Sequence, residues 1–137
     1  MATGGGDDGG PVPELAARAR ACADRLREAD SVLVASHIDA DGLSSAAVAT
    51  RALARAGVDH EVTFSKQLDE DEIGRVAAES ERRDHDAVLF TDFGSGQLDL
   101  IAGHEAADHF DPVIADHHQP ADAETEYHLN PILEGLD

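Results

Sequence analysis

Large aromatic side chains are scarce in this sequence, which has no tryptophan, one tyrosine and four phenylalanines among 137 residues. Its apolar fraction of 42% therefore consists largely of alanine and aliphatic residues. A core of small side chains requires close approach of the backbones, as when alanine-faced helices pack on a sheet. The length suits one domain and is short for two, since domains usually contain about 100–150 residues.

Cysteine is also nearly absent: Cys22 is the only one in the sequence. One cysteine excludes a disulfide framework and a thiolate metal cluster, and its place on an apolar helical face predicts simple packing. No apolar run approaches the length of a membrane span. Residues 1–10 lack the basic start and apolar run of a secretion signal. We therefore expect a cytoplasmic protein with no membrane partner.

Positive charge is the third deficit, with 10 Lys and Arg residues against 29 Asp and Glu residues and a formal net charge of −19. Self-repulsion of this size destabilises a compact chain unless counterions screen it. The acids are interleaved with periodic apolar residues instead of forming a tail, which favours a halophilic source over an acidic mesophilic one.

The pattern of apolar residues predicts alternating strands and helices. Residues 1–11 form a Gly-rich, acidic leader that we expect to be flexible, and residues 12–137 form one domain. Strands are expected at 31–36, 60–65, 86–91, 112–115 and 127–129, of which 31–36 and 86–91 should be buried. Helices are expected at 15–29, 43–56, 69–83 and 97–102, the second ending at Gly57. This alternation predicts a doubly wound parallel α/β sheet with helices on both faces.

Polar clusters follow three of the expected strands. In an open α/β sheet, ligand sites lie beyond the carboxyl ends of the strands, where the loops meet. The clusters should therefore share one crevice. They are His37, Asp39 and Asp41 after the first strand, Asp92 after the third, and Asp116, His117 and His118 after the fourth.

Four clustered carboxylates repel one another, and divalent cations remove that conflict. Oxygen ligands with a minority of imidazoles suit Mn²⁺ or Mg²⁺. Asp92 could bridge two ions, a geometry that generates a nucleophile from water and clamps a phosphoryl group. The helix after Gly42 would offer backbone N–H groups to an anion, with Ser44 as a further phosphate ligand.

Structural roles are expected for the other polar residues. The run from His37 to Gly42, taken alone, could be a turn whose aspartates cap the next helix, and Ser44 or Ser45 could cap a helix too. The loop Gly94-Ser95-Gly96 is more typical of a flexible turn than of a phosphate-binding loop. The remaining histidines have no partners at predicted strand ends, so surface or packing roles are expected. They are His60, His85, His104, His109 and His128.

Three motifs resemble those of the DHH phosphoesterase superfamily: the run from Ser36 to Gly42, then Thr91-Asp92, then the triplet Asp116-His117-His118. The likeness spans about residues 31–131 and is strongest to RecJ-type single-strand-specific exonucleases of archaea.

The resemblance implies specific roles for these residues. Asp39, Asp41 and Asp92 would ligate a two-manganese centre, with His117 as a further ligand and Asp116 as a ligand or orienting group. His118 would contact the scissile phosphate or a metal. His37 stands where bacterial relatives often have Asp. The family's fourth motif, another metal-binding Asp, and its C-terminal substrate domain have no counterpart before Asp137, so we expect a partial chain.

Three functions remain open from the sequence. The first is a RecJ-like nuclease hydrolysing single-stranded DNA or RNA with two Mn²⁺ or Mg²⁺ ions. The second is a phosphoesterase for small substrates such as short oligonucleotides, cyclic dinucleotides or pyrophosphate. The third is a non-catalytic scaffold in a replication or repair assembly. A receiver-like signalling domain fits poorly, since it lacks a late Lys and gives adjacent histidines no role. The oligomeric state is not indicated.

Overall fold

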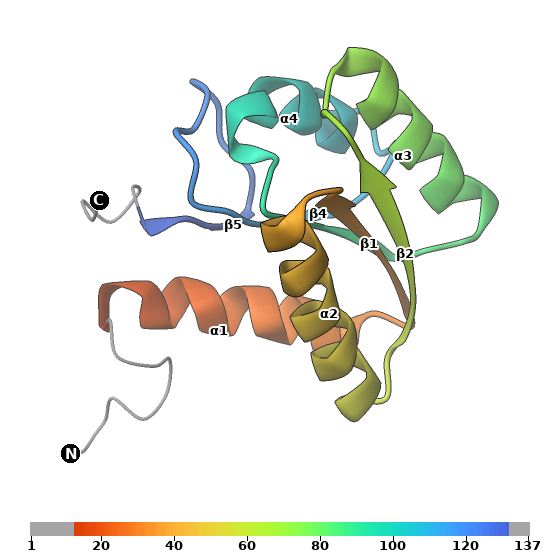
Figure 1. Ribbon diagram of the computed structural model, residues 1–137, viewed down its shortest axis with the longest axis vertical. Helices are drawn as coiled ribbons and strands as arrows, with labels where there is room; N and C mark the ends of the chain where they lie inside the picture. Colours follow the sequence, from red (N-terminus) through yellow and green to blue (C-terminus); the bar gives the residue numbers. More distant parts are fainter. Residues whose placement is uncertain (1–12, 132–137) are drawn as a thin grey trace.

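A computed structural model describes residues 13–131 of the chain, in which strands and helices alternate (Figure 1). The predicted leader, residues 1–11, lies outside the described residues. The elements in chain order are α1 (Pro13–Glu28), β1 (Ser31–His37), α2 (Ala40–Arg55), β2 (Asp59–Ser65), α3 (Glu70–Arg82), β3 (Ala87–Thr91), the 3-10 turn η2 (Ser95–Gln97), α4 (Leu98–Ala106), β4 (Pro112–Ala115) and β5 (Tyr127–Leu129).

The five strands form one parallel sheet in the order β2-β1-β3-β4-β5. The central strand β1 pairs with β2 on one side and β3 on the other, so that Val34 lies opposite both Val62 and Leu89. The chain thus reverses its direction of winding between β1 and β3. At such a switch point the loops beyond the carboxyl ends of the strands diverge and leave a crevice.

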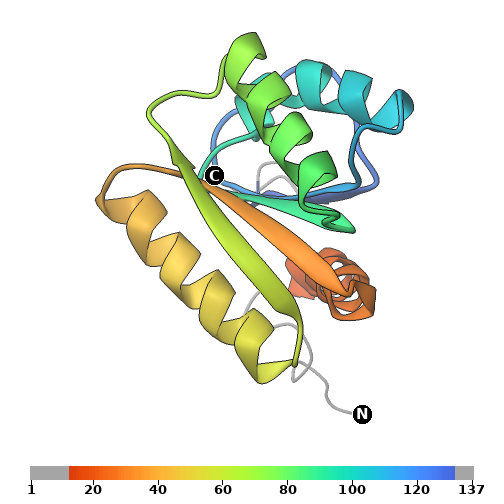
Figure 2. The same cartoon turned by 90° about the vertical axis from the view of Figure 1, so that its right-hand side faces the viewer.

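Each face of the sheet carries its own apolar core, because successive side chains of a strand point to opposite faces. Leu33 and Ala35 of β1 join the core under α3 and α4. Val32 and Val34 join the core under α1 and α2, which includes Cys22 as predicted. Figure 2 shows the two helix pairs on opposite sides of the sheet. The prediction of a doubly wound α/β sheet with helices on both faces is confirmed.

Two helix boundaries differ from the prediction by three residues or more. Helix α2 begins at Ala40 rather than Leu43, because Asp39 has an extended backbone and its side chain accepts a hydrogen bond from the N–H of Gly42. Asp39 is therefore the N-cap, and the prediction that Ser44 or Ser45 caps this helix is wrong. Helix α4 continues to Ala106, beyond the predicted end at Ala102.

The end of α2 follows the sequence prediction. Gly57 has a φ of 76°, the left-handed conformation that glycine adopts without strain. The N–H of the next residue, Val58, donates to the carbonyl of Leu53 and closes the helix. Among the described residues, none of the helices combines the length and the apolar character needed to cross a bilayer.

Candidate metal centre

Six of the seven predicted ligand residues meet at the carboxyl end of the sheet, in two groups of three. Within each group, one ligand atom per residue lies within 4.8 Å of the others. One group belongs to the ends of β1 and β3, and the other follows β4. The groups are His37, Asp39 and Asp92, and Asp116, His117 and His118.

A tight turn at the end of β1 positions the first group. The hydroxyl of Ser36, which is fully buried, can donate its one proton to the carbonyl oxygen of Gly42, at 2.9 Å, or to that of Thr91, at 3.1 Å. These contacts tie the end of β1 to the first turn of α2 and to the end of β3. A Cβ atom on Gly42 would lie 1.8 Å from the carbonyl oxygen of His37, so only glycine fits there.

Both ring nitrogens of His37 have neighbours. Nε2 lies 2.8 Å from the carbonyl oxygen of Lys66, and Nδ1 lies 2.8 Å from a carboxylate oxygen of Asp39. A carbonyl only accepts, so Nε2 carries a proton and Nδ1 carries either a second proton or a lone pair facing Asp39. Metal-bound histidines usually donate their outer nitrogen to a carbonyl or carboxylate in this way. The arrangement suits a cation between Nδ1 and Asp39.

Asp39 is an exposed carboxylate that the turn keeps ionised. The hydrogen bond from the N–H of Gly42 is the largest cause of a lowered pKa, ahead of burial, which opposes it, and the neighbouring His37. A carboxylate oxygen of Asp39 also lies within 4.8 Å of one of Asp92. Two carboxylates in contact repel each other when both are ionised, and a divalent cation relieves that repulsion.

Asp92 is the buried carboxylate that joins the two groups. It lies directly after β3, its side chain is only 6% exposed, and one of its oxygens is 3.3 Å from Nε2 of His117. Its φ of 66° is unusual for a residue other than glycine at the end of a strand. Such strain persists only where the surrounding structure imposes it, and it clusters at functional sites.

Asp116 is held more rigidly than the other carboxylates. Its Oδ1 accepts from the backbone N–H of His117 at 2.8 Å and lies 2.6 Å from Nδ1 of His118, while Oδ2 accepts from the N–H of Ser95 at 3.1 Å. Burial raises the pKa of this side chain, but these hydrogen bonds outweigh it and the pKa lies below its ordinary value.

This geometry supports the orienting role for Asp116 more than a ligand role. Both of its oxygens are occupied by hydrogen bonds from the protein, and its side chain is fully buried. Because Nδ1 of His118 is taken by Asp116, Nε2 is the nitrogen left for a substrate or a metal. His117, which is 64% exposed, approaches Asp92 instead.

A buried polar network behind Asp116 was not predicted. The hydroxyl of Ser95 lies 2.8 Å from Nε2 of His128 and accepts from the side-chain amide of Asn130 at 2.9 Å. Asn130 also donates to the carbonyl oxygen of His118 at 2.8 Å. The flexible-turn prediction for residues 94–96 is wrong, since Ser95 is fully buried and helps to hold Asp116. The packing prediction for His128 is confirmed.

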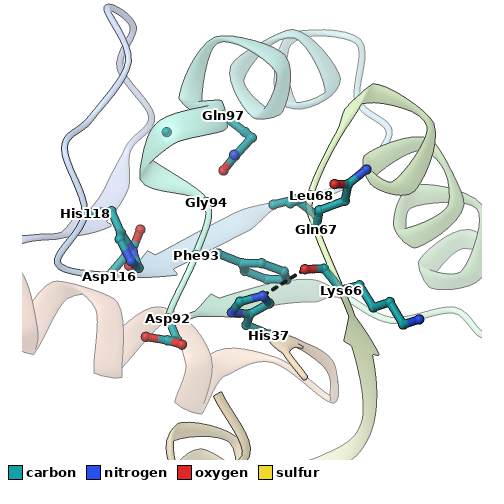
Figure 3. Close-up of a pocket in the computed structure, with 11 residues that line it drawn as sticks. His37, Lys66, Gln67, Leu68, Asp92, Phe93, Gly94, Gln97, Asp116 and His118 are labelled. Carbon is teal, nitrogen blue, oxygen red and sulfur yellow. Dashed lines mark hydrogen bonds and ion pairs between the residues drawn. The ribbon is translucent and has the colours of Figure 1, made fainter. Parts of the chain in front are cut away.

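The groups border an open cavity of about 330 Å³ between β1, β3 and the turn that leads into α4 (Figure 3). His37, Asp92 and His118 line it together with Phe93 and Gln97, and the rings of His37 and Phe93 lie side by side with centroids 6.0 Å apart. Figure 3 shows the imidazoles of His37 and His118 on opposite sides of Asp92. The cavity is large enough for a small ligand or one unit of a polymer.

Two predicted residues lie outside this arrangement. Asp41 is exposed in the first turn of α2 and belongs to neither ligand group. Ser44 is exposed one turn later and does not line the cavity. Their assignments as a metal ligand and a phosphate ligand stay predictions.

Residues 31–137 match the DHH family, N-terminal domain. An uncharacterized protein of Methanocaldococcus jannaschii is 33% identical over an alignment of 111 residues, which covers 77% of this chain and 24% of that protein. The chain therefore spans about a quarter of the length of that relative.

Two solved structures share the fold. RecJ of Thermus thermophilus, in complex with Mn²⁺, superposes with a TM-score of 0.66 and 22% identity, over 90% of this chain and 18% of that chain. An exonuclease RecJ bound to manganese gives a TM-score of 0.67 and 25% identity, over 90% of this chain and 32% of that chain.

Proposed function

The chain belongs to the DHH family, and from that premise we propose that it is part of a RecJ-like nuclease that hydrolyses phosphodiester bonds of single-stranded DNA or RNA. The observation that carries the proposal is the pair of ligand groups at one sheet edge, linked by the 3.3 Å approach of His117 to Asp92. The family membership and the Mn²⁺ complexes of similar structures support a metal-dependent phosphoesterase.

The residues fit two divalent ions, with Mn²⁺ or Mg²⁺ favoured. Nδ1 of His37 with the carboxylates of Asp39 and Asp92 would hold one ion, and Asp92 with His117 would contribute to a second. Asp41 is the proposed additional ligand. Carboxylate oxygens with a few imidazoles match the preference of Mn²⁺. When bound, such ions polarise the phosphoryl oxygen and activate a water molecule for attack.

The protein's own groups would position the phosphate and move a proton. His118, fixed through Nδ1 by Asp116, presents Nε2 to a phosphate oxygen and can donate a proton to the leaving group. Asp116 keeps that ring in one tautomer and orientation. The partly apolar wall with Phe93 and Gln97 offers a surface for the adjoining nucleotide.

Titration calorimetry with Mn²⁺ tests the metal assignment in the full chain. We expect Asp92→Asn to weaken Mn²⁺ binding by at least about tenfold, since ligand and outer-shell changes typically cost 10–100-fold. Asp59→Asn is the matched control, because Asp59 is exposed at the start of β2, away from the site. Equal affinity of the parent and the Asp92→Asn variant would disprove the bridging role.

Cleavage assays test the reaction. Mn²⁺-dependent hydrolysis of a labelled single-stranded oligonucleotide is expected, and His118→Ala should lower its rate by about 100-fold or more. The chain spans less than a third of the solved relatives, so we expect weaker turnover than from a longer chain that includes the following region. Faster cleavage of a dinucleotide or pyrophosphate than of the long strand would favour the small-substrate alternative. Binding without cleavage in the longer chain would favour a scaffold for replication or repair proteins.

A further inference from the structure

A second hollow with metal-binding side chains lies beside helix α4. It has a volume of about 300 Å³ and shares no lining residue with the cavity of the metal centre. Two imidazoles and two carboxylates line it. The lining residues are Glu70, Asp99, Leu100, Gly103, His104 and His109.

The two imidazoles already face each other through the nitrogens that a metal would use. Nδ1 of His104 and Nδ1 of His109 lie 2.8 Å apart. The backbone fixes this pairing, because the N–H of His109 donates to the carbonyl of His104 at 2.9 Å where α4 ends. Phe110 supports the ring of His104, with centroids 5.4 Å apart. The pair is therefore built into the end of the helix.

Two facing ring nitrogens can share a proton or a cation. Zinc–nitrogen bonds of about 2.0–2.1 Å at a tetrahedral angle separate two nitrogens by about 3.3 Å. The rings need to part by only about half an ångström to reach that separation. His109 is exposed and can make this adjustment. Burial and then the neighbouring His109 lower the pKa of His104, which keeps that ring neutral and able to bind metal.

We propose that His104 and His109 bind a zinc-type cation, with Glu70 or Asp99 as a carboxylate ligand and water completing the shell. In this structure neither carboxylate lies within 4.8 Å of both imidazole nitrogens. Glu70 and Asp99 are both exposed, so their side chains can turn toward the imidazoles when a cation binds. Imidazole nitrogens favour Zn²⁺, Co²⁺, Ni²⁺ and Cu²⁺ over Mn²⁺ and Mg²⁺. The chain would then carry an oxygen-rich centre at the sheet edge and a separate nitrogen-rich site on α4.

Zinc titration of a variant that lacks the histidines of the metal centre tests the site. In the full chain carrying His37→Ala, His117→Ala and His118→Ala, one Zn²⁺ ion should still bind. Adding His109→Gln should weaken its binding by at least about tenfold, as loss of one ligand does. His109 is exposed, and circular dichroism should show an unchanged fold. Zinc affinity that is unchanged by His109→Gln would overturn the proposal.

Controls separate this site from unspecific binding by acids and histidines. His60→Gln in the same background should leave zinc binding unchanged, because His60 lies on β2, outside the hollow, with its Nδ1 3.1 Å from the carbonyl oxygen of Val58. Mn²⁺ should bind far more weakly than Zn²⁺. With Cu²⁺ in place of zinc, pulsed electron paramagnetic resonance should detect two imidazole nitrogens. A single imidazole, or equal binding of Mn²⁺, would contradict the assignment.

Discussion

Gly42 lies where the end of β1 passes closest to the first turn of α2. A Cβ atom at this position would be 1.8 Å from the carbonyl oxygen of His37, which belongs to the backbone and cannot rotate away. We expect Gly42→Ala to lower the free energy of unfolding by about 3 kcal/mol or more. It should also displace His37 and Asp39 and weaken Mn²⁺ binding. Urea denaturation and calorimetry measure the two effects.

Gly74 is the matched control for that substitution. It lies inside α3, and apart from the helix's own neighbouring backbone no atom lies within 4 Å of the place where its Cβ would be. Gly74→Ala should therefore stabilise the protein by about 0.5–1 kcal/mol, the usual gain in a helix. A Gly42→Ala variant as stable as Gly74→Ala would show that the turn after β1 can relax.

His128 should make stability depend on pH. Burial is the main cause that lowers its pKa, so the folded protein holds it neutral. Below the unfolded pKa of about 6.5 the unfolded chain binds the proton more readily than the folded one. Stability should therefore fall as the pH drops from about 7 toward the folded pKa. His128→Gln should reduce the slope of unfolding free energy against pH between about pH 7 and 5. An unchanged slope would assign the dependence to other groups.

The site residues that directly follow a strand could be predicted from the sequence. Asp92 and the triplet from Asp116 to His118 directly follow buried apolar runs, and parallel strands carry such residues to one edge. Ser95 and His128 were not predictable as partners, because they are 33 positions apart and meet only when β5 aligns beside β4. The orienting role of Asp116 also depends on these three-dimensional contacts.

Whole elements followed from their apolar patterns, while their ends depended on local side chains. The uninterrupted run in β1 identified a strand buried on both faces. The start of α2 was missed by three residues because Asp39 serves both as N-cap and as a member of the ligand group. The alternative interpretation of this turn, in which its aspartates cap the next helix, is therefore correct for Asp39.

Two helices are followed by an aspartate in the left-handed conformation, where glycine is usual: Asp84 after α3 and Asp108 after α4. Asp84 follows α3 with a φ of 58°, and the next N–H, of His85, donates back to the carbonyl of Ser80. A side chain in this left-handed conformation is strained, although aspartate tolerates it better than most residues. Asp84→Gly should therefore stabilise the protein by about 0.5 kcal/mol. Thermal unfolding measures the gain.

Asp84→Asn is the control for the loss of charge. Asparagine removes the same negative charge but keeps a side chain in the left-handed conformation. If Asp84→Asn stabilises the protein as much as Asp84→Gly, relief of charge repulsion, and not of backbone strain, explains the gain.

At the scale of the whole molecule, repulsion among the acidic residues outweighs the stabilisation that the ion pairs provide. The net charge is −19, and arginine pairs such as Arg25–Asp111 and Arg83–Glu61 lie wholly or partly at the surface. Each exposed ion pair contributes only about 0–1 kcal/mol to the free energy of unfolding. Repulsion among the acids therefore has to be screened by ions from the solvent.

Folding should consequently require high salt. The Debye length falls from about 30 Å at 0.01 M to about 3 Å at 1 M, so molar salt confines each carboxylate's field to its nearest neighbours. We expect helical circular dichroism to be weak at low ionic strength and to rise cooperatively toward molar NaCl. Neutralising four exposed acids, in the variant Asp59→Asn, Asp71→Asn, Asp122→Asn and Glu124→Gln, should move the midpoint to lower salt, because less repulsion remains to be screened. Full helix content at low ionic strength, or a midpoint unmoved by these substitutions, would mean that packing in the two cores outweighs the charge and would remove the argument for a halophilic source.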